Sequence, residues 1–287
     1  KNCILKDWGV TKLRHWYLGD WATPEGINQK DSLSIDVVSN CVMSESYMTM
    51  AKIAKVLGKD ADAEKYTKKY HQQNAVLHKA YFNPETNSYS TGTQIDLIYP
   101  MFVGATPSEC IDAVESTLKK ETAGLFNGHL STGLVGVPII TQWATKVGET
   151  KFLYDMLKKR EYPGYLYMLD NGADLTWEHW NGRRSHIHNC FNGIGSWFYQ
   201  ALAGINPDEN QPGYKNIIIR PQLIDAITWV KATKDTPYGE MAVKWEKVDG
   251  KFVINVKIPV GSTATVYMPD GEQKELVSGN HTLECNL

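Results

Sequence analysis

The chain has 287 residues, of which 42% are hydrophobic and 22% charged, and its formal net charge is −2. This length allows one large domain plus a smaller one, each with its own core. The balanced charge, without a lysine or arginine cluster, argues against nucleic acid or an anionic membrane as the partner. No apolar run approaches the roughly 20 residues that a membrane span requires, so no membrane segment is expected. A neutral ligand fits this composition better.

The first half of the chain predicts helical hairpins. Residues 43–57 carry apolar side chains every three or four positions, and Gly58 stands where a helix would end in the left-handed conformation. A second helix is expected to begin with Asp60 or Asp62 as its cap and to stop at residues 83–84, Asn-Pro. Two amphipathic helices joined by a short turn therefore open the helical region.

Further helix signals follow along the chain. Residues 106–109, Thr-Pro-Ser-Glu, combine a capping box with proline at the first helical position. Pro100 would bend an earlier helix. Additional helices are predicted near residues 94–103, 133–147, 150–159 and 189–203.

After residue 206 the hydrophobic period changes from helical to alternating. Alternation on both sides of Asp249-Gly250 predicts a β-hairpin. Shorter strands are predicted at residues 216–220, 227–232, 263–268 and 281–285. The sequence therefore predicts a helical domain over residues 1–206 and a small antiparallel β-sandwich over residues 207–287.

The predicted fold class is mainly α with a β domain, and the paired helices suggest a partial (α/α)6 toroid whose loops at one end form a cleft. An α-solenoid uses the same hairpins, and the sequence alone does not separate the two. The β-sandwich at the end of the chain favours the toroid by analogy only.

Residues 176–182, Thr-Trp-Glu-His-Trp-Asn-Gly, carry the most informative pattern. Glu178 lies between Trp177 and Trp180, and a carboxylate among large apolar rings has its pKa changed by partial desolvation. Indole faces can also stack on the C–H faces of a pyranose. The alternative is a buried tryptophan pair with an acid at its rim. The pattern indicates a glycosidase in which Glu178 is the catalytic carboxylate.

Metal and cofactor sites are not expected. His179, His186 and His188 lie close in sequence, but no cysteine stands at ligand spacing and nothing in the pattern fixes the three on one face. The five cysteines are scattered and odd in number, so we interpret them as buried thiols rather than a disulfide framework.

Several motifs of this chain occur in the same order as those of one known family. They are residues 19–24 (Gly-Asp-Trp-Ala-Thr-Pro), 127–133 (Asn-Gly-His-Leu-Ser-Thr-Gly), 162–168 (Tyr-Pro-Gly-Tyr-Leu-Tyr-Met), 171–182 around Glu178, 185–188 (Ser-His-Ile-His), and the strand-like residues 217–221 and 263–269. Together they resemble the α-L-rhamnosidases of glycoside hydrolase family 78. In that family the segment similar to residues 171–182 carries the general base.

The resemblance implies inverting hydrolysis of terminal α-L-rhamnosides with Glu178 as the general base. Inversion requires two carboxyl groups about 6.5–9.5 Å apart. The family's acidic block with the general acid is not found here. We therefore expect the chain to be the C-terminal part of a longer enzyme, to need the missing N-terminal part of the same polypeptide, and to be unable to hydrolyse rhamnosides at a normal rate alone. Because the chain begins with Lys1, any targeting signal would lie upstream and the compartment is left open.

The resemblance also implies a rhamnose-containing oligosaccharide or glycoside as the ligand. Asp20 and Trp21 would bind the sugar, although Asp20 could instead cap the turn after Gly19. His188 could donate to a ring hydroxyl, cap the next helix, or do both. The expected substrate-binding residues are Asp20, Trp21, Tyr165, Trp177, Trp180 and His188, with Tyr165 equally consistent with the core.

Two other functions remain open from the sequence. Another glycosidase or lyase of the (α/α)6 type would keep the tryptophan-flanked acid but act on a different sugar. A non-catalytic carbohydrate-binding fragment would keep the aromatic residues and tolerate the loss of Glu178.

Overall fold

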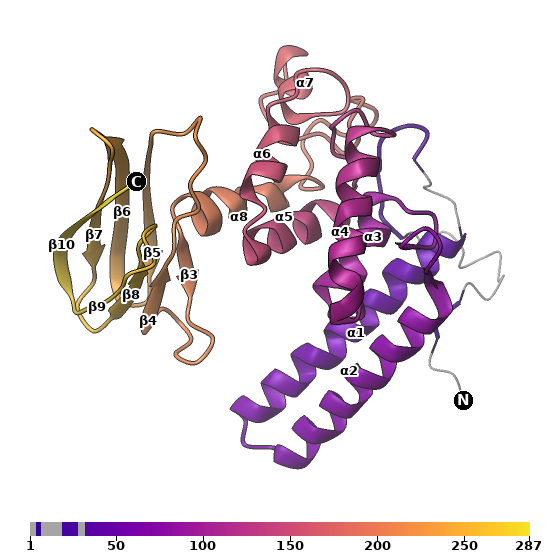
Figure 1. Ribbon diagram of the computed structural model, residues 1–287, viewed down its shortest axis with the longest axis horizontal. Coiled ribbons are helices and arrows are strands. Elements are labelled where there is room, and N and C mark those ends of the chain that lie inside the picture. The colour runs from indigo at the N-terminus through magenta and orange to yellow at the C-terminus, as the bar shows by residue number, and fades with distance from the viewer. Residues whose placement is uncertain (1–3, 7–18, 28–31) are drawn as a thin grey trace. The chain divides into compact units, whose positions relative to one another are not determined.

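The computed structural model describes residues 4–6, 19–27 and 32–287 (Figure 1). The chain divides into two compact units, one of Lys1–Trp143 with Tyr154–Gly193 and one of Ala144–Leu153 with Ile194–Leu287. The second unit thus contains all the strands after residue 204 and also helical segments from before residue 206. The domain boundary after residue 206 stays a prediction.

The first two helices, α1 (Ser32–Val56) and α2 (Asp60–Tyr81), pack side by side as a hairpin (Figure 1). Gly58 has a φ of +66°, which confirms the predicted end of the first helix. The predicted aspartate cap is wrong, because Lys59 occupies the cap position of α2 without a side-chain hydrogen bond. Asp60 and Asp62 lie in the first helical turn instead, where their charges favour the positive end of the helix dipole.

The next pair is α3 (Gln94–Phe102), which contains Pro100, and α4 (Ser108–Ala123). The predicted capping box of α4 is wrong, because Pro107 is its cap residue and no side chain bonds to its first turn. The hydroxyl of Thr106 accepts a hydrogen bond from the hydroxyl of Tyr89 at 3.0 Å instead. Tyr89 belongs to a short hairpin of β1 (Phe82–Asn83) and β2 (Ser88–Tyr89).

The later helices are shorter than the hydrophobic pattern predicts. They are α5 (Gly136–Val147), α6 (Thr150–Leu157), and α7 (Tyr165–Asp170), the last of which we did not expect as a helix. The helix predicted over residues 189–203 is broken into a 3-10 turn (Asn192–Ile194), α8 (Gly195–Trp197) and a π-helical turn (Phe198–Leu202). Gly193 and Gly195 interrupt the sequence there and weaken a regular helix.

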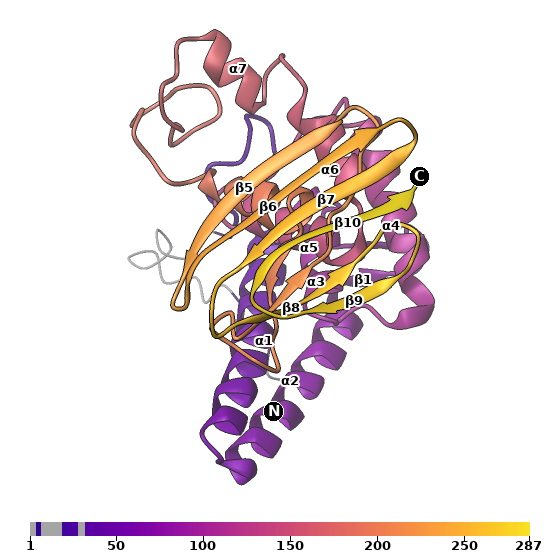
Figure 2. The ribbon, with the colours of Figure 1, turned by 90° about the vertical axis from the view of Figure 1, so that its left-hand side faces the viewer.

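The other strands form two four-stranded sheets, in the orders β10-β7-β6-β5 and β3-β4-β8-β9. Figure 2 shows β5, β6, β7 and β10 of the first sheet side by side. The strands are β3 (Ile205–Pro207), β4 (Asn216–Ile219), β5 (Trp229–Thr236), β6 (Gly239–Val248), β7 (Lys251–Ile258), β8 (Thr263–Tyr267), β9 (Gln273–Leu276) and β10 (Gly279–Asn286). All pairs are antiparallel except β4 with β8, which is parallel and departs from the predicted pattern. Strands β3 and β9 are too short to give an alternating signal and were not predicted.

The predicted hairpin at Asp249-Gly250 is confirmed. Both residues have positive φ, 49° and 75°, as the tightest hairpin turn requires, and Val248 pairs with Lys251 across it. The alternating apolar residues of β6 and β7 are all buried: Met241, Val243, Trp245, Phe252, Ile254, Val256 and Ile258. They form the core of the β region with residues of the second sheet. Among the described residues, no helix is long and apolar enough to cross a membrane.

Candidate active site

The segment that carries Glu178 is a loop whose two arms bond to each other. The backbone N–H of Glu178 donates to the carbonyl of Ser185 at 2.8 Å, and that of His188 donates to the carbonyl of Thr176 at 2.9 Å. Gly182 lies between the arms with a φ of +75°, and a Cβ there would come within 3.1 Å of the Trp177 ring. Glycine is therefore required at this turn, and the turn brings the residues after it back toward Glu178.

Trp180 anchors this loop in the core. Its side chain is 1% exposed, its indole N–H donates to the carbonyl of Thr132 at 2.8 Å, and its ring stacks on Phe191 with centroids 4.0 Å apart. No face of the indole is left for a sugar. The expected sugar contact of Trp180 is therefore wrong, and the residue instead fixes the base of the loop that carries Glu178.

Trp177 and Tyr165, two more of the aromatic residues expected to contact a sugar, also pack against neighbouring groups. Trp177 is 5% exposed and is stacked against His186 at 4.9 Å. The hydroxyl of Tyr165 donates to the carbonyl of Phe191 at 2.7 Å, and its ring meets Trp180 edge-on. Burial raises the pKa of Tyr165 well above its usual value. Tyr165 is half-buried, so the core and the substrate contact both remain open for it, whereas buried Trp177 supports the loop rather than offering an open face.

The Glu178 carboxylate is held at the edge of this packed layer, with 14% of its side chain exposed. One oxygen lies 3.2 Å from Nη1 of Arg184, and the other accepts from the Ser185 N–H at 3.4 Å. Partial desolvation alone would raise the pKa of Glu178, but the Ser185 N–H and the Arg184 guanidinium outweigh it and lower the pKa below its usual value. The carboxylate is therefore ionised at neutral pH, as a proton acceptor must be.

Trp21 lies beside Glu178, although the two are far apart in sequence. The guanidinium of Arg184, which pairs with Glu178, sits 5.2 Å from the centre of the Trp21 ring. The ring of His179 meets Trp21 edge-on at 5.7 Å, and its Nε2 lies 3.8 Å from the Glu178 carboxylate. The structure thus places Trp21, which is expected to contact the substrate, near Glu178, which is expected to be the catalytic carboxylate.

Asp20, by contrast, is not part of this surface. The residue is 6% exposed, and its carboxylate accepts backbone N–H groups of Gly133 (2.7 Å), Val135 (2.9 Å) and Gly136 (2.8 Å) at the start of α5. Burial raises the pKa of Asp20 to about 6, although the three N–H groups oppose that rise. Because the carboxylate is buried and bonded to three backbone N–H groups, a sugar cannot reach it, and the expected sugar contact of Asp20 is wrong.

The contacts of Asp20 join two of the sequence motifs, residues 19–24 and residues 127–133. A side chain at Gly133 would collide with the carbonyl oxygen of Trp21, and one at Gly136 would collide with the Asp20 carboxylate. The N–H of Leu134 also donates to the Trp21 carbonyl at 2.7 Å. The loop of residues 19–21 and the entry to α5 are therefore complementary surfaces, and this close contact fixes the position of Trp21.

His188 keeps one ring nitrogen for a ligand. Its Nδ1 accepts from the backbone N–H of Cys190 at 3.1 Å, so the neutral ring carries its proton on Nε2. Capping and donation to a sugar hydroxyl are therefore compatible. His186 pairs through Nε2 with the carbonyl of Gly182, and no group of three potential metal ligands gathers within residues 4–6, 19–27 and 32–287.

Sequence reasoning missed Arg184 and His179. The available signal was the turn at Gly182, which places residues on its two sides opposite each other, but spacing alone does not say which side chain reaches the carboxylate. The Nε2 atom of His179 is buried without a hydrogen-bond partner among the residues that the structure describes.

Two family descriptions match this chain. Residues 5–202 match the bacterial alpha-L-rhamnosidase 6 hairpin glycosidase domain, and residues 204–283 match the bacterial alpha-L-rhamnosidase C-terminal domain. An alpha-L-rhamnosidase of Formosa agariphila is 28% identical over 274 residues, which cover 91% of this chain and 29% of that protein. One from an Alteromonas species is 27% identical over 277 residues, which cover 88% of this chain and 29% of that protein. The chain thus spans less than a third of the length of these relatives.

Solved structures are similar over nearly the whole chain. An alpha-L-rhamnosidase from Dictyoglumus thermophilum superposes with a TM-score of 0.85 at 24% identity, covering 96% of this chain and 35% of that one. The Streptomyces avermitilis alpha-L-rhamnosidase, solved in complex with L-rhamnose, gives a TM-score of 0.84 at 26% identity, with 93% of this chain and 28% of that one covered. These likenesses establish a helical six-hairpin region followed by a β domain.

Proposed function

The chain belongs to the bacterial α-L-rhamnosidase six-hairpin glycosidase family, and from this membership we propose that it forms part of a hydrolase for terminal α-L-rhamnosides with Glu178 as the general base. One observation carries the role of Glu178. Its carboxylate is ionised, is partly exposed on a loop anchored by Trp180, and lies beside Trp21 and Arg184. Trp21 and His188 are among the residues of the expected set that remain available to bind substrate.

The chemistry that follows is an inverting displacement. Glu178 takes a proton from a water molecule while the water oxygen attacks the anomeric carbon and the bond to the leaving oxygen breaks. A second carboxylic acid, about 6.5–9.5 Å away, protonates that leaving oxygen. We propose that a segment outside these 287 residues supplies this acid, because the chain spans only 29% of the length of the Formosa and Alteromonas relatives.

Replacing Glu178 in the full-length protein tests the general base. The Glu178→Gln variant keeps the size and packing of the side chain but cannot accept a proton, so kcat on an aryl α-L-rhamnoside should fall roughly 100- to 10,000-fold. The thermal midpoint and the affinity for L-rhamnose should stay as in the wild type. Asp174→Asn, an exposed acid four residues earlier, is the matched control. Unchanged turnover, or a loss of stability in place of turnover, contradicts the assignment.

Comparing the 287-residue chain with the full-length protein tests the second carboxyl group. The shorter chain should bind L-rhamnose weakly and show no turnover above the aryl rhamnoside's spontaneous hydrolysis. Equal turnover per molecule would place the acid within the shorter chain.

A further inference from the structure

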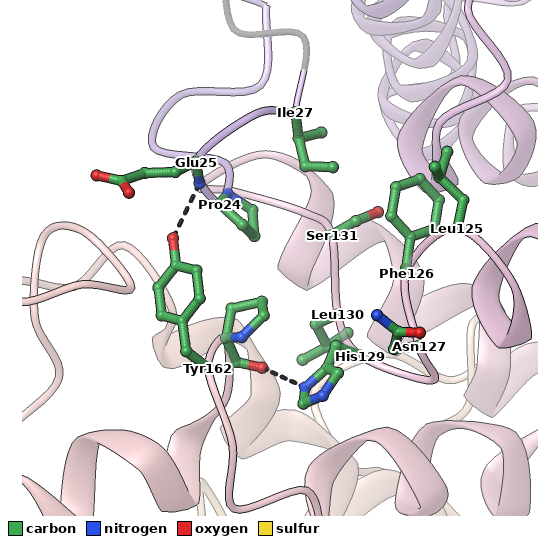
Figure 3. Close-up of a pocket in the computed structure, with 11 residues that line it drawn as sticks. Pro24, Glu25, Ile27, Leu125, Phe126, Asn127, His129, Leu130, Ser131 and Tyr162 are labelled. Atoms are coloured by element: carbon green, nitrogen blue, oxygen red, sulfur yellow. Dashed lines mark hydrogen bonds between the residues drawn. The ribbon is translucent and has the colours of Figure 1, made fainter.

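A separate pocket lies at the other end of the loop that carries Trp21. Its volume is about 180 Å³, and Pro24, Glu25, Phe126, Ser131 and Tyr162 are among the residues that line it (Figure 3). A cavity of about 150 Å³ accommodates one benzene ring. This pocket therefore has room for one six-membered ring and is too small for a longer oligosaccharide.

The lining combines flat apolar surfaces with polar groups. Pro24, Phe126 and the ring of Tyr162 supply the apolar part, while the Ser131 hydroxyl and the Asn127 amide supply the polar part (Figure 3). A pyranose has the same division, with C–H faces above and below the ring and hydroxyl groups around its edge. The lining suits a sugar better than it suits a purely apolar or an ionic ligand.

Ser131 gives the most specific indication of a ligand. The residue is 3% exposed, and its hydroxyl has no hydrogen-bond partner in the part of the chain that the structure describes. Its backbone N–H, in contrast, donates to Gln94 at 2.8 Å. A buried polar group without a partner costs roughly 1–3 kcal/mol, so such groups are rare unless something else binds them. A ligand hydroxyl in this pocket would satisfy Ser131.

Tyr162 offers a second hydrogen bond. Its hydroxyl oxygen accepts the backbone N–H of Glu25 at 2.9 Å (Figure 3), which leaves the phenolic hydrogen to donate elsewhere. Burial raises the pKa of Tyr162, so this hydrogen is retained through the neutral pH range. The two hydroxyls can therefore bind two groups on one ring.

The pocket is joined to the Glu178 loop by direct contacts. The Glu25 carboxylate accepts a hydrogen bond from the side-chain amide of Asn181 at 2.5 Å, and Asn181 follows Glu178 by three positions. The loop of residues 19–27 also has Trp21 next to Glu178's partner Arg184 and Glu25 in the pocket. The loop of residues 19–27 thus contacts both the pocket and the surroundings of Glu178.

We propose that this pocket binds a second pyranose, the sugar unit on the leaving-group side of the glycosidic bond, an inference that rests on the proposed rhamnosidase function. A terminal rhamnosyl unit has a neighbouring sugar only on its leaving-group side, so a second ring in the pocket belongs to the leaving group. The pocket therefore selects rhamnosyl disaccharides over rhamnosides with a small leaving group.

Calorimetric titration of the full-length Glu178→Gln protein tests the pocket. The ligands are methyl α-L-rhamnoside and a set of α-L-rhamnosyl-glucose disaccharides that differ in linkage. At least one disaccharide should bind more tightly than methyl rhamnoside. Adding Ser131→Ala or Tyr162→Phe should raise the Kd of that disaccharide about three- to tenfold and leave the Kd of methyl rhamnoside unchanged.

A matched control separates the pocket from general effects of losing a hydroxyl. Ser90 also has a buried hydroxyl without a hydrogen-bond partner in the described part of the chain, but it does not line the pocket, so Ser90→Ala should leave both Kd values unchanged. The proposal is overturned if no disaccharide binds more tightly than methyl rhamnoside, or if Ser131→Ala and Tyr162→Phe weaken both ligands equally or neither. Hydrolysis by Glu178→Gln at the wild-type rate would instead count against the general base, and the two failures are distinguishable.

Discussion

Two carboxylates in the same helical unit have opposite surroundings. Asp20 is 6% exposed and accepts three backbone N–H groups, whereas 14% of the Glu178 side chain is exposed and its closest charged partner is the guanidinium of an exposed arginine. Burial raises the pKa of Asp20 to about 6, while the Ser185 N–H and Arg184 lower the pKa of Glu178 against its partial desolvation.

The difference shows which acid a substrate can reach. Backbone donors cannot move away from Asp20, so its carboxylate is a structural connection between the loop of residues 19–21 and α5. An arginine side chain can leave Glu178 when a ligand arrives, because the pair is partly in solvent and worth little by itself. A perturbed pKa alone would have favoured the wrong residue.

The largest expected effect comes from removing the buried acid. Asp20→Ala leaves three buried N–H groups without an acceptor, and the chain should lose roughly 3 kcal/mol or more of unfolding free energy at pH 7. Thermal unfolding followed by circular dichroism measures this loss. Glu25→Ala, an exposed acid on the same loop, is the control and should change the midpoint little. If both variants unfold at the wild-type temperature, Asp20 does not connect the two segments.

The pH dependence of stability gives a second test of the same contrast. Asp20 has a folded pKa of about 6 against a usual 3.8, so between these values the folded chain binds more protons than the unfolded one. The contribution that this raised pKa makes to the free energy of unfolding is therefore complete below about pH 4. It is lost as the pH rises through about 6, a change on the order of 3 kcal/mol. The difference in thermal midpoint between wild type and Asp20→Asn should shrink from pH 4 to pH 7. Parallel profiles would contradict the raised pKa.

A pair of tryptophan substitutions sharpens the contrast between support and surface. Trp180→Phe loses the hydrogen bond to Thr132 and part of a packed ring, and it should cost about 2 kcal/mol of stability. Trp21→Phe changes a half-buried ring beside Arg184, and it should cost less than about 1 kcal/mol but raise the KM for a rhamnoside. Thermal midpoints and KM values of the full-length variants test these two roles. A larger loss of stability in Trp21→Phe, with a raised KM in Trp180→Phe, would contradict them.

Sequence pattern predicted the elements whose signal is local. The end of α1 at Gly58, the hairpin at Asp249-Gly250 and the alternating core of β6 and β7 all follow from side-chain period and positive φ. Caps were not predictable in the same way, because the Thr106 hydroxyl that fits a capping box bonds to Tyr89 from a separate hairpin. The parallel pairing of β4 with β8 is likewise a tertiary choice that neither strand shows alone.

In the candidate site, too, the sequence predicted local features and missed those that depend on distant partners. The motif around Glu178 was informative because one carboxylate among rings is an unusual local pattern, and the structure places it beside Trp21. The roles of Trp180 and Asp20 could not be read from spacing, since each depends on partners far away in sequence, such as Thr132 and Gly136. Ser131 gave no signal at all, because only a three-dimensional structure shows a hydroxyl without a partner.

The smallest expected effect concerns the arginine that pairs with Glu178. Removing it in Arg184→Ala should let the pKa of Glu178 rise toward its usual value, and activity requires the ionised carboxylate. The acid limb of kcat/KM should therefore move to higher pH, so that the variant loses activity earlier as the pH falls. Because Arg184 is 55% exposed, solvent and salt screen its charge and keep this shift small.

The neighbouring arginine provides the control for this shift. Arg183 lies 3.8 Å from Glu25 rather than near Glu178, so Arg183→Ala should leave the acid limb in place. A pH profile of the full-length protein on an aryl rhamnoside, measured at low and high salt, distinguishes the two variants. If Arg184→Ala leaves the limb unmoved at low salt, the arginine does not set the basicity of Glu178. Glu178 would then owe its ionised state to the Ser185 N–H, and its partner would be as fixed as those of Asp20.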